Sequence, residues 1–318
     1  MLWVMPLAVP AMVSAQQEFY ADPYYYETNA DGSATLTAYT GPGGSVVIPR
    51  SISNLPVTGL YNTFGAEPFN PNTTLNDVTI PCGVVTIAYC AFNYCTSLSN
   101  VAIPPSVTSI GAFAFNDTAL ATITLPTNVT SIGDDAFSGC TSLTNAALYG
   151  ITTLAEDAFA YCTSLETVTL PATIGEIIGN PFDDCPRLTR VFFQGNFPDD
   201  VSYIPDSGWP FGNNPGLTVY CLPGTSNWIF LTEHTGIIPV LWNPLIQTGN
   251  GHFGVQNNQF GFDITGTPAI PIVVEASTNL ANPVWTALTN VTLTNGLFHF
   301  SEPAQANSAG RFYRISSP

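Results

Sequence analysis

The sequence has very few charged residues and no lysine at all. Charged side chains make up 8% of the 318 residues, and five arginines stand against 22 acidic residues, so the formal net charge is −17. Nucleic acids and anionic membrane surfaces both attract proteins through basic patches. We therefore predict that neither is a partner of this protein.

The sequence also lacks long apolar runs after its first residues. None reaches the roughly 18 apolar residues that a membrane-spanning helix needs. Residues 2–13 are apolar, and Val13, Ser14 and Ala15 offer the small residues that suit signal peptidase. We expect residues 1–15 to be a signal peptide of a secreted or cell-surface protein, with a buried N-terminal strand as the alternative. The usual preceding basic residues are missing, which we interpret as a truncated start.

Motifs of common enzymes are missing as well. There is no G-x-S-x-G nucleophile elbow, no H-E-x-x-H motif, and no C-x₂-C spacing for zinc. The three histidines, His234, His252 and His299, lie in no recognised motif. We predict no enzymatic activity, no cofactor and no metal of that kind. An extracellular hydrolase is the remote alternative, because two carboxylates in a cleft suffice for glycoside hydrolysis.

An internal repeat of 22 or 23 residues is the dominant feature of the sequence. Its pattern is L-x-x-V-x-I-P-x-x-V-x-x-I-G-x-x-A-F-x-x-C-x-x-L. The leucines that open each unit are Leu75, Leu98, Leu120, Leu143, Leu165 and Leu188. The phenylalanines that recur in register are Phe92, Phe115, Phe137, Phe159 and Phe182. Repeats of this length indicate a solenoid, whose coils bury their apolar positions by stacking.

Each unit reads as one strand followed by turns. Val-x-Ile alternates with the period of a strand, and the following proline ends it. We expect the second V-x-x-I segment to turn the chain, with Gly111 and Gly133 allowing unusual backbone angles. The Ala-Phe pair then anchors the far side in a brief helical or 3₁₀ turn. The predicted fold class is therefore mainly β, a solenoid with short strands.

The units "SVTSIGAFAF" and "NVTSIGDDAFSGCTSL" resemble the bacterial leucine-rich repeats of the BspA type. The resemblance is close over residues 75–193. Residues 16–74 are interpreted as an N-terminal cap with a first degenerate repeat, and residues 194–244 as a capping segment rich in aromatic residues. The resemblance implies secretion, a cell-surface location, and protein binding or adhesion.

The pattern changes near residue 247. Apolar and polar residues then alternate between Asn, Gly and Pro turns up to residue 318. We predict a small antiparallel, β-sandwich-like domain over residues 247–318. It is similar to C-terminal modules found on secreted bacterial repeat proteins.

Four of the seven cysteines share one position of the repeat, and they are Cys95, Cys140, Cys162 and Cys185. Stacked positions hold parallel side chains about 4.8 Å apart, whereas a disulfide needs converging Cβ atoms about 3.8 Å apart. We therefore expect these four to be buried thiols. Cys82 and Cys90 lie off this column, and whether they form a disulfide stays open.

Acidic residues also stack in the repeat register. Asp134 aligns with Glu156, and Asp135 aligns with Asp157. Like charges on adjacent coils repel unless water or a cation screens them. A solvated turn is the simpler interpretation, and a Ca²⁺ site at these four residues is the alternative.

The position between the two strand apolar residues is predicted to face outward. It is occupied by Thr79, Ala102, Thr124, Ala147, Thr169 and Phe192. We call this set the outer row. Its uncharged surface can serve solubility alone, or it can be an extended recognition face.

The sequence therefore predicts a surface or secreted binding protein that uses the outer row to bind a protein or a glycan. The alternative is a structural spacer, tethered to the envelope or matrix by its C-terminal domain. The sequence identifies neither the ligand, nor the attachment mode, nor the oligomeric state.

Overall fold

The structure is a computed structural model. It describes residues 18–61, 72–202, 210–211, 214, 216–279, 284–304 and 311–316. The signal peptide expected at residues 1–15 lies outside the described residues. No helix in the described part of the chain is long and apolar enough to cross a membrane.

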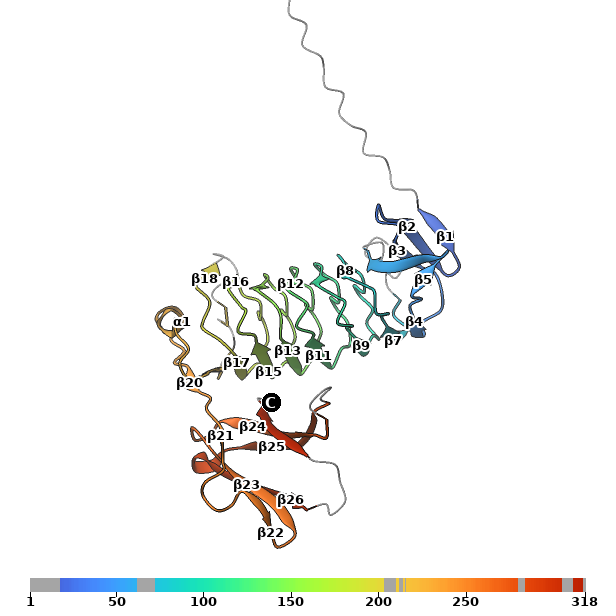
Figure 1. The fold of residues 1–318 in the computed structure, drawn as a ribbon. Coiled ribbons are helices and arrows are strands. Elements are labelled where there is room, and N and C mark those ends of the chain that lie inside the picture. The colour runs from blue at the N-terminus through green and yellow to red at the C-terminus, as the bar shows by residue number, and fades with distance from the viewer. Residues whose placement is uncertain are drawn as a thin grey trace, which may run out of the picture.

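The strands predicted at the V-x-I position of the repeats form one side of a solenoid (Figure 1). They form two consecutive parallel sheets. The first consists of β4 (Gly44–Val47), β7 (Leu75–Thr79) and β9 (Asn100–Ala102). The second consists of β11 (Thr122–Leu125), β13 (Asn145–Leu148), β15 (Thr167–Leu170), β17 (Arg190–Phe193), β19 (Thr218–Cys221) and β20 (Val240–Leu241). The sheet thus continues past residue 193, where the regular sequence repeats end.

The second V-x-x-I segment does more than turn the chain, contrary to the expectation from sequence. It forms another parallel sheet, on the opposite side of each coil. Its strands are β6 (Leu55–Leu60), β8 (Thr86–Ile87), β10 (Ser109–Ile110), β12 (Ser131–Ile132), β14 (Thr153–Leu154), β16 (Glu176–Ile178) and β18 (Asp200–Ser202).

The glycines after this segment allow neighbouring coils to approach closely. The predicted role, to allow unusual backbone angles, was wrong. Neither Gly111 nor Gly133 has a positive φ. A Cβ atom would lie 2.5 Å from the backbone nitrogen of Tyr89 at position 111, and 2.4 Å from that of Ala112 at position 133. Coils can therefore stack closely here only because these two residues have no side chain.

The core between the two sheets confirms both predicted apolar columns. The six repeat leucines are at most 1% exposed. The phenylalanine rings stack along the solenoid with centroids 5.1–5.8 Å apart and planes within 19° of parallel. Phe211 continues the stack beyond Phe182 at 5.6 Å. This continuous aromatic column gives each coil a core that it could not form alone.

The Ala-Phe segments are turns and contain left-handed residues. Before each Ala-Phe pair, Cys90, Phe113, Asp135 and Asp157 have φ between 53° and 58°. Backbone bonds link these turns from coil to coil, as in Asp135 N to Glu156 O (3.2 Å) and Phe137 N to Ala158 O (2.8 Å). Asp is among the residues that tolerate the left-handed region best, which gives a backbone reason for acids at this position.

Different caps close the two ends of the solenoid. At the N-terminal end, β1 (Phe19–Ala21), β2 (Tyr24–Thr28) and β3 (Ala34–Tyr39) form an antiparallel extension that joins β6, and β5 (Ser51–Ile52) pairs with β6. At the other end, helix α1 (Trp228–Thr235) buries Leu231, and the Trp228 ring meets Phe193 edge-on at 5.2 Å.

The C-terminal part is an antiparallel, sandwich-like domain, as predicted. One sheet contains β21 (Leu245–Gln247), β22 (Gly254–Gln256), β23 (Gln259–Thr265) and β26 (Leu297–Pro303). The other contains β24 (Pro271–Ser277), β25 (Thr286–Thr292) and β27 (Phe312–Ser316), and the short 3₁₀ segment Thr294–Gly296 precedes β26. Phe262, Ile264, Ile272 and Val274 lie in the core of this domain.

Candidate functional site

The outer row forms a ladder across the strands on the side away from the solenoid core. Thr124 pairs with Ala147, Ala147 with Thr169, and Thr169 with Phe192. Thr79, Ala102 and Thr124 are exposed, as predicted. The other three are not exposed, because Ala147, Thr169 and Phe192 retain 9%, 4% and 3% of their accessible surface. The expectation of a fully open face was therefore wrong for its C-terminal half.

The C-terminal domain lies under this half of the row (Figure 1). The Phe192 ring stacks on Tyr220 of β19 at 4.6 Å and meets Trp242 edge-on at 6.1 Å. Phe192 and Tyr220 belong to the same buried cluster as Phe262 and Ile264 of the C-terminal domain. Solenoid and C-terminal domain therefore share a hydrophobic core.

A cleft of about 700 Å³ opens where the covered half meets the open half. The solenoid contributes Thr124, Asn145, Tyr149 and Gln194 to its walls, and Trp242 lies at the link between the domains. A cleft of this volume is in the usual range for ligand sites. Four outer-row residues line it, namely Thr124, Ala147, Thr169 and Phe192.

The C-terminal domain contributes one ion pair to the cleft. Arg314 Nε donates to Glu275 Oε2 at 2.6 Å, and the Arg314 guanidinium lies 4.5 Å from the centroid of the Trp285 ring. Both charged groups line the cleft. Since they compensate each other, the cleft offers neutral polar groups and aromatic rings in a protein of high net negative charge.

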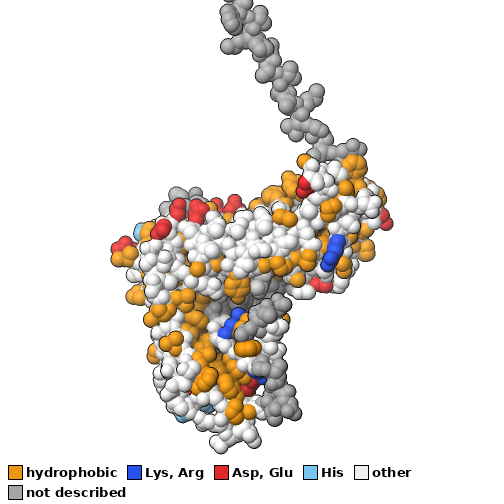
Figure 2. All heavy atoms as spheres, viewed as in Figure 1, with side chains coloured by type: hydrophobic (Ala, Val, Ile, Leu, Met, Phe, Trp, Pro, Cys, Tyr) orange, Lys and Arg blue, Asp and Glu red, His pale blue; other side chains and the backbone are white. Residues whose placement is uncertain are grey.

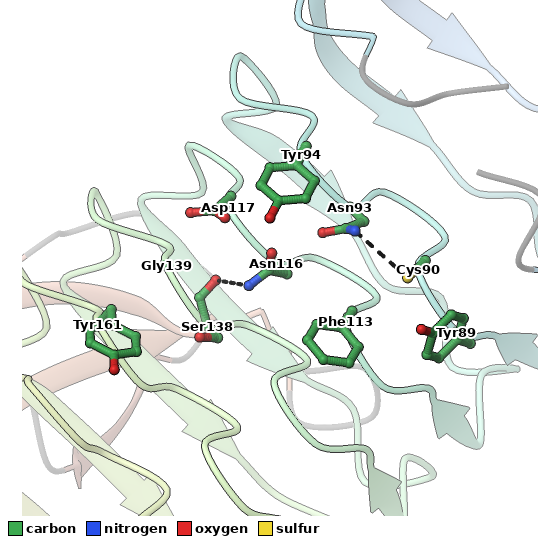
Figure 3. Close-up of a pocket in the computed structure, with 10 residues that line it drawn as sticks. All are labelled: Tyr89, Cys90, Asn93, Tyr94, Phe113, Asn116, Asp117, Ser138, Gly139 and Tyr161. Carbon is green, nitrogen blue, oxygen red and sulfur yellow. Dashed lines mark hydrogen bonds between the residues drawn. The ribbon is translucent and has the colours of Figure 1, made fainter. Parts of the chain in front are cut away.

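A second hollow lies on the turn side of the solenoid (Figure 3). It measures about 450 Å³, and exposed Tyr89 and Tyr161 lie near its opposite ends. Buried Asn116 donates to the Ser138 carbonyl oxygen at 3.0 Å, which holds neighbouring coils together. Tyr94, which is also exposed, lines this hollow as well. The walls of this hollow come from the solenoid alone, whereas both domains contribute to the walls of the cleft.

The four acidic residues of the calcium hypothesis lie on the turn side as well. Acidic side chains gather along the solenoid edge away from the C-terminal domain (Figure 2). Burial raises the pKa of Asp157 from 3.8 to about 6, and the neighbouring Asp135 and Glu156 add to the shift. Among the described residues, these acids do not form a group of three converging ligand atoms. Calcium binding by Asp134, Asp135, Glu156 and Asp157 stays a prediction.

The column cysteines are buried thiols, as expected. Their sulfur atoms lie against backbone carbonyls of a preceding coil, as in Cys162 Sγ to Phe137 O (3.2 Å) and Cys185 Sγ to Phe159 O (3.1 Å). Burial raises the pKa of Cys95 to about 12, so this thiol is protonated and unreactive. Cys82 and Cys90 are free thiols in the structure and do not pair.

One polar cluster was missed from the sequence. Asp263, His252 and His299 meet on the C-terminal domain, although no motif connects them. Asp263 and His299 are direct partners on paired strands. Finding them required the strand register, which the alternating sequence pattern does not contain.

Comparison with known proteins gives a family match for the repeats. Residues 62–207 match the family described as BspA type Leucine rich repeat region, in six copies. No curated protein matches the chain.

Several solved structures are similar. A leucine-rich repeat protein from Bacteroides ovatus is 23% identical, with 66% of this chain and 73% of that chain covered and a TM-score of 0.46. A leucine-rich repeat protein of T. pallidum is 28% identical, with 59% and 86% covered and a TM-score of 0.47. A leucine rich cell surface protein from Faecalibacterium prausnitzii is 21% identical, with 70% and 98% covered and a TM-score of 0.22.

The six matched copies agree with the stacked parallel strands and with the continuous leucine and phenylalanine columns. Residues 62–207 of this chain are therefore a BspA-type leucine-rich repeat region, and a small antiparallel β domain follows it.

Proposed function

We propose that this protein is a secreted or cell-surface binding protein that holds a segment of another protein in the cleft between solenoid and C-terminal domain. The observation that carries the proposal is the wall of that cleft, where outer-row residues meet Tyr149, Trp242 and Arg314. Tyr, Trp and Arg are the residue types that contribute most to binding energy at protein interfaces. No catalytic step is part of this function.

The open half of the outer row extends the proposed site. Thr79, Ala102 and Thr124 are exposed and uncharged, and they lie on three consecutive coils that lead toward the cleft. An interface core is typically depleted of charged residues. A bound segment can therefore lie along the open row and place one side chain in the cleft.

The test is a selection of ligands with the full-length protein, from a displayed random peptide library and from a glycan array. Binders are then measured against Thr124→Arg, which places a long charged side chain at the cleft. We expect at least a tenfold loss of affinity, which corresponds to about 1.4 kcal/mol. Peptide binders that lose affinity in Thr124→Arg support the proposal. Glycan binders that lose affinity in the same variant would support the cleft as the site but contradict a protein ligand.

Thr130→Arg is the matched control, because Thr130 is also exposed but lies directly before β12, on the opposite side of the coil. It should leave binding unchanged. Ligands that tolerate Thr124→Arg, or that lose as much affinity in Thr130→Arg, would exclude the cleft as the binding site.

Attachment through the C-terminal domain is the second candidate function. Phe253 and Val255, at the β22 hairpin, are 47% and 65% exposed. Exposed apolar side chains of this kind favour contact with another surface. The double variant Phe253→Ser, Val255→Ser should release the protein from cells into the medium if this hairpin tethers it, and unchanged cell fractionation would argue against a tether here.

A further inference from the structure

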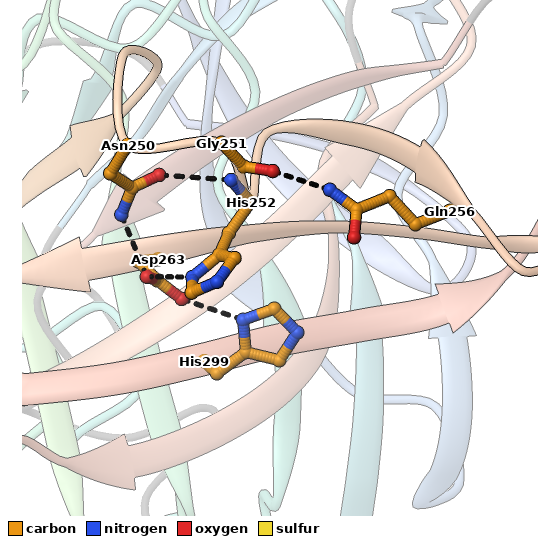
Figure 4. A network of polar contacts seen from close by, with 6 residues as sticks. All are labelled: Asn250, Gly251, His252, Gln256, Asp263 and His299. Carbon is orange, nitrogen blue, oxygen red and sulfur yellow. Dashed lines mark hydrogen bonds and ion pairs between the residues drawn. The ribbon is translucent and has the colours of Figure 1, made fainter.

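His252, Asp263 and His299 lie together in the C-terminal domain (Figure 4). Asp263 lies on β23 and His299 directly opposite on β26. His252 comes from the loop between β21 and β22. Two paired strands and one loop therefore bring two imidazoles to a single carboxylate.

Both oxygens of the carboxylate face an imidazole nitrogen. His252 Nδ1 lies 2.6 Å from Asp263 Oδ2, and His299 Nδ1 lies 2.6 Å from Asp263 Oδ1. The Asp263 residue is only 6% exposed. The hydrogen bonds from the two histidines lower the pKa of Asp263, which keeps its carboxylate ionised.

The loop that carries His252 is held in place by Asn250. The Asn250 side-chain amide donates to Asp263 Oδ2 at 2.7 Å, and its oxygen accepts the His252 backbone N–H at 3.1 Å. Gln256 donates to the Gly251 carbonyl oxygen on the same loop. The backbone position of His252 is thus held by contacts that do not involve its ring nitrogens.

Two imidazole nitrogens and one carboxylate oxygen are a ligand set for divalent transition metals such as Zn²⁺. The three ligand atoms lie within 4.8 Å of one another. An ion at the centre would take the place of the two protons between the nitrogens and Asp263. Each neutral imidazole would then carry its proton on Nε2.

The site is open to solvent on one side. The His252 and His299 side chains are 59% and 53% exposed, and they border a hollow of about 220 Å³. Gly261 leaves room for the His299 ring, because a Cβ atom there would lie 3.3 Å from His299 Nε2. A water molecule can therefore complete the coordination, as in sites with three protein ligands.

We propose that His252, Asp263 and His299 bind one divalent transition-metal ion, with zinc as the representative ion, through both Nδ1 atoms and the carboxylate. The ion links the β21–β22 loop to β26 and so fastens the open side of this sheet. This inference does not depend on the binding function proposed above.

Calorimetric titration of the full-length protein with ZnCl₂, after removal of metal by EDTA, tests the proposal. The titration uses a Cys82→Ser background, because Cys82 is an exposed thiol that can bind zinc by itself. We expect one zinc per chain. His252→Asn and His299→Asn should each weaken binding at least tenfold, since each removes a ligand.

His234→Asn is the matched control, since His234 is the remaining histidine and lies on α1, where its ring contacts the Phe230 carbonyl oxygen. It should bind zinc like the parent protein. Imidazole nitrogen resonances provide a second readout on the folded parent: zinc should shift those of His252 and His299 and leave His234 unchanged. Equal affinity in all three histidine variants, or unshifted resonances of His252 and His299, would overturn the proposal.

Discussion

The two halves of the outer row share one position in the repeat and have opposite surroundings. Thr79, Ala102 and Thr124 lie in water, whereas Ala147, Thr169 and Phe192 lie under the C-terminal domain. The row changes in chemistry along its length, from Thr and Ala to the large apolar Phe192 and then Tyr220 of the next strand. A position in a solenoid repeat therefore determines which side of the sheet a residue occupies, and the neighbouring domain determines whether that side is exposed.

The comparison also shows why the binding site is expected at the junction. An open sheet face offers shallow contacts, whereas the edge of a docked domain adds a second wall. The cleft has aromatic and charged groups from Trp242 and Arg314 that the open row lacks. A concave site that buries more of a ligand is the more favourable place for binding.

The largest expected effect lies inside the solenoid, where the two halves should not differ. Phe115→Ala removes a ring beneath the open half, and Phe159→Ala removes one beneath the covered half. Both rings are fully buried. Each substitution should cost roughly 3–5 kcal/mol of unfolding free energy through the cavity it creates. Denaturant unfolding measures this. A much smaller cost in one half would show that the aromatic column is not equally packed along its length.

A smaller effect is expected on the outer row itself, and here the two halves should differ. Phe192→Ala should cost about 3 kcal/mol, because the ring is buried between β19 and the C-terminal domain. Thr79→Ala, at the same repeat position in the open half, should stay within about 0.5 kcal/mol of wild type. Denaturant midpoints of the two variants give the comparison. Similar values for both would mean that the C-terminal domain does not pack on the row in solution.

The smallest expected effect concerns the turn side of the coils, where Asp157 lies. Folding raises the pKa of Asp157 from 3.8 to about 6, so the folded state binds this proton more tightly than the unfolded chain. Stability from this group is therefore highest below pH 4 and is lost as the pH rises to about 6. Asp157→Asn should be more stable than wild type at pH 7 by about 1 kcal/mol, after allowance for solvent screening.

Thermal unfolding at pH 3.5 and pH 7 checks this prediction, because the advantage of Asp157→Asn should vanish at the lower pH. Glu233→Gln, which removes the charge of an exposed acid on α1, is the control for the loss of one carboxylate. An advantage that is the same at both pH values would point to a cause other than charge.

Much of the repeat region was predictable from the sequence, because stacked coils have the same residue types at equivalent positions. Recurrence in register predicts the leucine and phenylalanine columns, the first strand of each unit and the buried cysteines. The second sheet was missed because its strands within the regular repeats have only two or three residues, which is too short for an alternating pattern to show. The left-handed turns at Asp135 and Asp157 were missed because the repeat consensus does not show backbone angles.

The candidate sites were harder to predict, and for a common reason. The cleft needs residues of β11, β17 and the C-terminal domain at one place, and the histidine cluster needs the register of β23 and β26. These contacts join segments that share no repeat. A chain that ended at residue 244 would leave Phe192 and Tyr220 uncovered, because the C-terminal domain completes their buried cluster.

By itself, the sequence determined the coil: its length, its buried columns and the family of its repeats, because each coil packs mainly on identical positions of its neighbours. Only the tertiary structure decided which part of the outer row stays open, where a cleft forms, and that His252 and His299 meet at Asp263. Those outcomes depend on how a second domain packs and how its strands pair, and no repeating pattern in the sequence encodes them.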